Sequence, residues 1–216
     1  MDFLDERTRR IILSLLGTIF FVYSCVILPL FKILPYGTLK KAAVLDISGF
    51  PVAQGEIESN FYYDVIELRY LASIPLVGSI QGQLERNYSS IGKNSDYWFL
   101  WHATEIWGPI AILLGITAGI ILSIDSLSIL FWEKPVLPFG WKLAFVIGLV
   151  GTSIQWLLFF LLWLSGEAET GTAVGTLGIK PVPGWPLLFL NILGLVGFLW
   201  AVFQQVKAAE TYSNHV

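Results

Sequence analysis

Few side chains in this 216-residue chain could carry out chemistry. The sequence contains one cysteine, Cys25, and two histidines, His102 and His215. One cysteine excludes thiol–disulfide chemistry of the two-cysteine kind. Two histidines, one of them at the C-terminal tip, exclude a zinc or haem site built on several histidines. We therefore expect neither an enzyme nor a metal site.

His102 is the residue with the most chemical potential. It stands in the sequence Trp98-Phe-Leu-Trp-His-Ala-Thr-Glu105, at the start of a long apolar stretch. One imidazole could ligate the magnesium of a chlorophyll-type pigment or pair with Glu105, and a hydrogen bond to water or to a loop carbonyl is the less specific interpretation. We expect no cofactor, with a pigment at His102 as the alternative.

Two amide side chains, Gln155 and Asn191, occur deep inside apolar stretches. An unpaired amide in hydrocarbon costs several kcal/mol, so both are expected to face the interior of a helix bundle. Their predicted depths differ by roughly 5 Å at 1.5 Å per residue, which would allow a hydrogen bond between them. Such bonds contribute about 0.6–2 kcal/mol in membranes. Packing is the favoured interpretation, and a contact with a polar ligand is the alternative.

Small residues are spaced for close helix approach in three of the apolar stretches. Gly115 and Gly119 form a GxxxG pattern, which is typical of helix contacts in membranes. We favour packing within one chain over a dedicated dimer seam. The glycines expected at helix contacts are Gly115, Gly119, Gly148, Gly151, Gly194 and Gly197.

The composition indicates that these residues lie in a membrane protein. The chain is 55% hydrophobic and 13% charged, with a mean hydropathy of +0.69. Its 13 basic and 16 acidic side chains exclude a nucleic-acid binder. A membrane-spanning helix needs about 20 mostly apolar residues. The stretches that qualify are 11–34, 106–132, 143–164 and 185–206.

Charged residues are nearly absent from the middle of these spans. Lys32 and Glu105 lie at span ends, and Asp125 is expected near the inner interface, roughly 28 Å along the second span. A proton pump, an ion-coupled transporter or a voltage sensor normally needs an ionisable residue at mid-depth. The sequence therefore disfavours these functions.

The flanking charges predict the orientation. Four spans place both termini on one side, and short cytoplasmic segments are enriched in Lys and Arg. We expect segments 1–10, 133–142 and 207–216 to be cytoplasmic, with the first span retained as a signal anchor. The basic residues on that side are Arg7, Arg9, Arg10, Lys134, Lys142 and Lys207.

The long segment 35–105 predicts a small β-rich extracytoplasmic domain. Segments 41–47, 60–71 and 76–88 are rich in β-branched and aromatic residues, and turn residues separate them. We expect three or four antiparallel strands, with a short helix in 60–71 as the alternative. Asn87 opens an N-glycosylation sequon in this segment. The outer loop 165–184 is rich in glycine.

Together these features predict an all-α membrane protein: a bundle of four transmembrane helices with the β-rich domain between the first and second helices. This layout resembles that of claudin-like tetraspan proteins. The resemblance is one of topology only. In that family a Trp-x-Leu-Trp motif is followed by a pair of cysteines, and this combination is missing here because Cys25 is the only cysteine.

We expect a non-catalytic membrane subunit or scaffold of a larger membrane protein complex, acting by helix packing and outer-loop contacts. Its partners would be membrane lipids and other membrane subunits or copies of itself. The alternatives are an oligomeric channel or transporter, and a pigment-binding subunit using His102.

The charge pattern makes a testable prediction of topology. In variants carrying Ser90→Cys or Thr172→Cys, an impermeant thiol reagent added outside intact cells should label the new cysteine. The Val136→Cys variant should not be labelled, because residue 136 lies in the predicted inner loop. Labelling at residue 136 from outside would contradict the four-span topology.

Overall fold

The computed structural model of the chain describes residues 5–47, 50–74, 78–87, 98–137, 139–164 and 182–213. The chain divides into two compact units. One comprises Met1–Ile33, Ile110–Gln155 and Pro186–Val216, and the other comprises Leu34–Pro109 and Trp156–Trp185.

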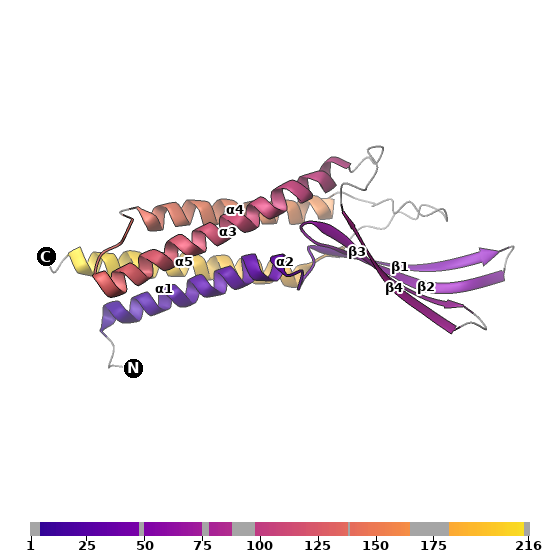
Figure 1. Ribbon diagram of the computed structural model, residues 1–216, viewed down its shortest axis with the longest axis horizontal. Helices are drawn as coiled ribbons and strands as arrows, with labels where there is room; N and C mark the ends of the chain where they lie inside the picture. The colour runs from indigo at the N-terminus through magenta and orange to yellow at the C-terminus, as the bar shows by residue number, and fades with distance from the viewer. Residues whose placement is uncertain are drawn as a thin grey trace. The chain divides into compact units, whose positions relative to one another are not determined.

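Within the described residues, four helices are long and apolar enough to cross a membrane, so the chain is a multi-pass membrane protein. The first span consists of α1 (Glu6–Val22), a π-helical turn (Tyr23–Ile27) and α2 (Leu28–Leu30). The other three spans lie in α3 (Trp98–Trp132), α4 (Gly140–Leu164) and α5 (Trp185–Ser213) (Figure 1).

The parts of these helices in the first unit form a bundle around two apolar clusters. The start of α1, the end of α5 and the turn between α3 and α4 all lie at one end of this bundle (Figure 1). The smaller cluster, at this end, consists of Ile11, Ile129 and Ala208. The buried residues of the larger cluster are Phe21, Cys25, Ala118, Leu122, Ala144, Phe198, Ala201 and Val202.

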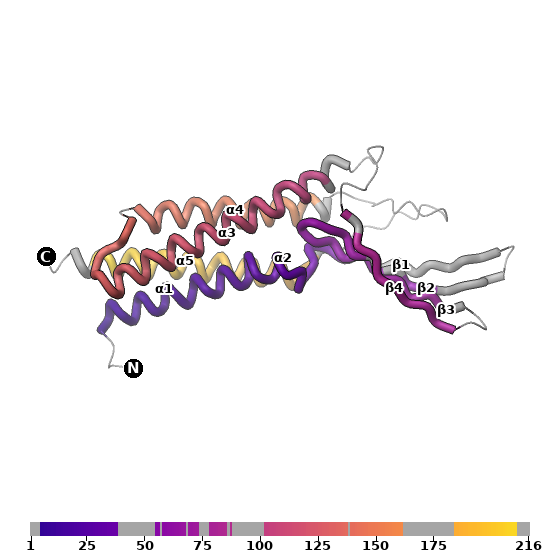
Figure 2. Tube along the Cα trace, viewed as in Figure 1, coloured from indigo at the N-terminus to yellow at the C-terminus, as the bar shows by residue number. Residues whose placement is uncertain are grey.

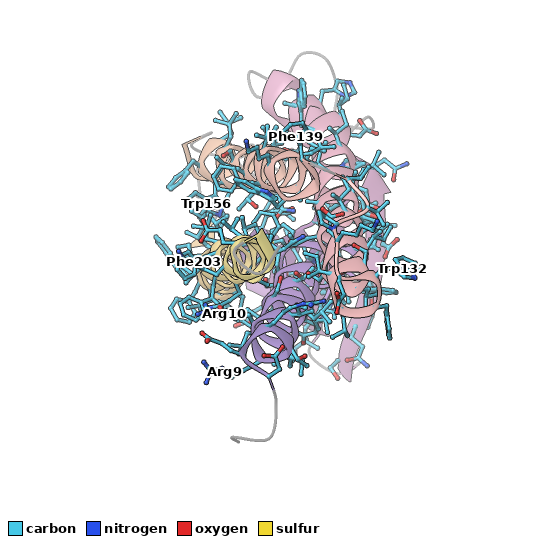
Figure 3. All side chains as sticks on the ribbon, turned by 90° about the vertical axis from the view of Figure 1, so that its left-hand side faces the viewer. Arg9, Arg10, Trp132, Phe139, Trp156 and Phe203 are labelled. Atoms are coloured by element: carbon cyan, nitrogen blue, oxygen red, sulfur yellow. The ribbon has the colours of Figure 1, made fainter. Side chains whose placement is uncertain are left out.

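The outer surface of the bundle is also apolar. Trp132 and Phe203 are exposed and point away from the ring of helices (Figure 3). Leu16, Leu113 and Val146 are exposed on three different helices. A helix that is hydrophobic all round is expected in a membrane, where lipid covers the face that does not pack against protein.

The helices approach one another at glycines. A Cβ atom added at Gly17 would lie 2.5 Å from the backbone oxygen of Gly197, so α1 and α5 meet nearly backbone to backbone. The six glycines singled out in the sequence also lie against other helices of the same chain. The nearest residues to Gly115, Gly119, Gly148, Gly151, Gly194 and Gly197 are, in that order, Val26, Val22, Phe198, Ala111, Ser24 and Phe20.

The second unit contains an antiparallel sheet in the order β4-β3-β2-β1-β5. Its strands are β1 (Gly37–Ile47), β2 (Phe50–Phe61), β3 (Val65–Ile74), β4 (Gly78–Asn87) and the short β5 (Val182–Pro183). The first four strands follow one another as hairpins (Figure 2). β5 pairs with β1 only at Gly37 and Thr38.

The expected strand region between the first two spans is confirmed, but two of its details were wrong. Segment 60–71 is neither one strand nor a helix, because a turn closed by the hydrogen bond from Tyr62 N to Val65 O (2.9 Å) separates β2 from β3. β2 was not expected, since Pro51, Gln54 and Gly55 have low strand propensity. It is nevertheless a central strand, paired on both edges.

The glycine contacts predict that equal substitutions will have unequal effects. Gly17→Ala should destabilise the bundle by about 1–3 kcal/mol, because the new methyl group would meet the Gly197 carbonyl. Gly115→Ala should cost less than Gly17→Ala, because its methyl group would meet the Val26 side chain (2.9 Å) and no backbone atom, while alanine favours the helix by up to ~1 kcal/mol. Unfolding in mixed micelles measures both variants, and equal losses would contradict this packing.

Candidate functional site

The backbone oxygen of Cys25 is the first functional feature of the bundle. In an α-helix this oxygen would accept a hydrogen bond from the residue four positions later, which is Pro29 and has no N–H. The preceding π-helical turn, in which Leu28 N donates to Tyr23 O, does not replace the missing proline donor. The side chain of Gln155 does, because its Nε2 donates to Cys25 O at 2.6 Å.

This contact differs from the one that the sequence suggested. Gln155 and Asn191 are both buried in the bundle, but no hydrogen bond joins their side chains. Gln155 donates to the carbonyl of Cys25 in the first span, and Asn191 contributes its backbone oxygen, 3.8 Å from Cys25 Sγ. The side-chain oxygens Gln155 Oε1 and Asn191 Oδ1 accept no hydrogen bond from the protein.

A second polar region surrounds Asp125. Asp125 lies two turns before α3 ends, and its side chain is completely buried. Its Oδ1 accepts a hydrogen bond from Leu137 N (3.3 Å). Ser128 Oγ accepts one from Val136 N (3.1 Å), so both side chains hold the α3–α4 turn against the end of α3. Gly140 leaves room for the carboxylate, because a Cβ there would overlap Asp125 Oδ2.

The same region contains buried polar residues that the sequence did not reveal. Ser14 Oγ on α1 lies 3.1 Å from Ser126 Oγ on α3. Gln205 on α5 is buried as well. The available signal was the spacing of Asp125 and Ser126 one turn after Leu122. That spacing puts polar residues on or beside the helix face that packs into the bundle.

His102 and Glu105 form a pair on the first turns of α3. His102 Nδ1 lies 3.0 Å from Glu105 Oε2, and both side chains are half-buried. This is one of the two specific roles that the sequence allowed for the histidine. The pigment at His102 stays a prediction.

The sheet has two chemically different faces on β3 and β4. Residues Tyr70 and Ala72 share one face with Ile80 and Leu84, because the register pairs Tyr70 with Gly82 and Ala72 with Ile80. The ring of Tyr70 covers Gly82, where an added Cβ would lie 2.2 Å from the Tyr70 hydroxyl oxygen. The opposite face carries mainly polar residues, including Glu67, Arg69, Gln81, Gln83 and Glu85.

A buried carboxylate anchors the polar face near the β2–β3 turn. Arg69 Nε donates to Glu67 Oε1 (3.0 Å), and the Tyr62 hydroxyl donates to Glu67 Oε2 (3.2 Å). Burial and the neighbouring Glu67 carboxylate raise the pKa of Tyr62 to about 12. The phenol therefore keeps its proton at neutral pH and continues to donate to Glu67.

Asn87, the possible glycosylation site, is the last residue of β4 and is exposed. The rest of its sequon, Tyr88 and Ser89, lies outside the described residues. Glycosylation of Asn87 therefore stays a prediction.

Comparisons with known proteins assign no family to the chain, since no protein-family model matches it and no curated protein matches it either. Function is a property of sites and not of folds. The surfaces and polar groups of this chain are therefore the evidence for what it does.

The hydrogen bond from Gln155 to the Cys25 carbonyl can be tested by mutation. Gln155→Leu should lower the free energy of unfolding by about 1–3 kcal/mol, because it leaves a buried acceptor unpaired. In a Pro29→Ala background the same substitution should cost much less, because residue 29 then has an N–H that can donate to Cys25 O. A double-mutant cycle in mixed micelles measures the difference.

Ser153→Ala is the matched control, since Ser153 is exposed on the same helix. It should change the free energy of unfolding by less than about 0.5 kcal/mol in both backgrounds. An equal cost of Gln155→Leu with and without Pro29 would refute the role assigned to the glutamine.

Proposed function

We propose that the protein is a non-catalytic membrane subunit or scaffold that binds a protein partner through its sheet. The observation that carries this proposal is the exposed apolar face of β3 and β4, which lies beside a strand edge with which no described strand pairs. Outer-loop contact would then be the main interface, with lipid and neighbouring helices around the bundle.

The apolar face is unusual for a surface in contact with water. Tyr70 is 44% exposed, and Ile80 and Leu84 are each 46% exposed. These three side chains lie together on two neighbouring strands with no charged residue between them on that face. Contiguous exposed apolar groups rimmed by polar residues commonly mark interaction sites.

The edge of the sheet supports the same proposal. β4 is the last strand in the order, and no described strand pairs with its outer edge. It is ten residues long and contains no proline, and its only charged residues, Glu85 and Arg86, lie near one end. An edge of this kind offers backbone donors and acceptors to an extended segment of a partner, while the apolar face provides side-chain contacts.

The bundle argues for the sheet as the main interface. Its small residues are used within the chain, since each glycine singled out in the sequence lies against another helix of the same protein. The exposed helix faces carry large residues such as Leu16, Leu113 and Val146. These faces suit lipid or loose helix contacts better than a close glycine-lined seam.

The test is the size of the native particle after gentle solubilisation of the membrane. The wild-type protein should migrate as a complex larger than its own 24.1 kDa plus detergent. The double variant Ile80→Glu, Leu84→Glu should be released from the complex, because two carboxylates would be buried in the apolar contact.

Gln81→Glu with Gln83→Glu is the matched control, because it places the same charges on the same strand but on the polar face. It should leave the complex intact. A wild-type protein that purifies as a monomer and is active by itself in transport or catalysis would refute the proposal in favour of a channel or an enzyme.

A further inference from the structure

A layer of polar side chains lies between the two apolar clusters of the bundle. It consists of Ser14 on α1, Asp125 and Ser126 on α3, and Gln205 on α5. On α3 these residues lie between Leu122 of the larger cluster and Ile129 of the smaller one. We call these four residues the polar layer.

Ser14 and Gln205 also lie between the smaller and the larger apolar cluster, as judged by their positions along α1 and α5. Ser14 lies one turn after Ile11, and Gln205 lies between Ala201 and Ala208, so each has the smaller cluster on one side and the larger on the other. Ser14 and Ser126 are in direct contact, at 3.1 Å between their hydroxyl oxygens. Asp125 and Gln205 are buried at the same level, and Asp125 Oδ2 lies against Gly140 at the start of α4.

The polar layer contains atoms whose hydrogen-bonding capacity the protein does not use. Asp125 is 0% exposed, and its Oδ2 has no hydrogen-bond partner among the residues that the structure describes. Gln205 is 1% exposed, and neither its Oε1 nor its Nε2 has one. Each buried polar atom left unpaired costs about 1–3 kcal/mol, and the two oxygens among them, Asp125 Oδ2 and Gln205 Oε1, are the atoms that a bound cation would satisfy.

No basic side chain in the described part of the chain forms an ion pair with Asp125. The two nearby arginines of α1 have other partners. Arg7 donates to the backbone oxygen of Ile129 and pairs with Glu133 at 3.4 Å. Arg10 pairs with Glu6 and its Nη1 lies 3.4 Å from Gln204 Oε1, while its buried Nε has no hydrogen-bond partner among the described residues. Among the described residues, the buried carboxylate therefore has no direct counter-ion.

We propose that the polar layer binds one small alkali cation, with sodium as the reference ion. Its donors would be oxygens of Asp125, Gln205, Ser14 and Ser126, which are the hard ligands that such ions prefer. One carboxylate and one monovalent cation form a neutral group, which can be buried between apolar clusters. A divalent ion would leave a net positive charge, and no group of three acidic, histidine or cysteine residues that could hold a metal occurs among the described residues.

The location gives the cation a structural consequence. The proposed ligands come from α1, α3 and α5, and Asp125 also holds the α3–α4 turn through Leu137. A bound ion would therefore tie together all the helix ends at this side of the bundle. Because an ion that binds only the folded protein stabilises it by mass action, unfolding reports its binding.

The test uses the full-length protein purified in detergent. Its melting temperature is measured in sodium, lithium and potassium chloride against choline chloride, at constant ionic strength. We expect a saturable rise with at least one alkali cation and none with choline. Direct binding of radioactive sodium to the wild-type protein is the second measurement, and it requires no variant that must fold.

Variants then assign the site. Asp125→Asn should abolish the alkali-dependent shift, and Gln205→Leu should raise the apparent Kd at least tenfold. Ser153→Ala, an exposed site on α4, should leave the shift unchanged. Equal melting temperatures in all salts together with no sodium binding would overturn the proposal, and so would a shift that Asp125→Asn retains.

Discussion

The carbonyl of Cys25 is the constraint on which the bundle depends. Pro29 removes its helical donor, and hydrocarbon offers no water to replace it. The replacement comes from Gln155, more than a hundred residues later in the sequence and on a different helix. The first span is therefore complete only when α4 has packed, and the contact that satisfies it also fixes which face of α4 turns inward.

Glycines bring α3 and α5 close to the same part of the first span. Gly194 allows α5 to approach Ser24 and Cys25, and Gly115 and Gly119 accept Val26 and Val22 of the first span. A bulkier residue at these positions would hold the helices farther apart. A hydrogen bond weakens steeply with distance. Close packing at the small residues and the hydrogen bond of the single amide therefore both depend on a short separation between helices.

Much of this architecture could be predicted from the sequence, because long apolar stretches have few alternatives to spanning helices. The strand region was also predictable, but its second strand was not, since a central position outweighs the low propensity of Pro51 and Gly55. The partner of Gln155 was missed because hydropathy gives depth but not direction. The readable signal was Pro29, which frees the carbonyl four residues earlier. The burial of Asp125 was missed for a similar reason, since the α3–α4 turn folds back and binds its carboxylate.

Apolar contact alone does not determine how helices are aligned along their axes, because lipid is as apolar as a leucine side chain. In this bundle the apolar clusters alternate with polar contacts, one between Gln155 and Cys25 and one between Ser14 and Ser126. A shift of the first span by one turn would keep apolar residues in contact with apolar residues but would separate both polar pairs. The polar contacts therefore select one alignment among several of similar apolar burial. An ion in the polar layer would strengthen that selection at the end where all the helices meet.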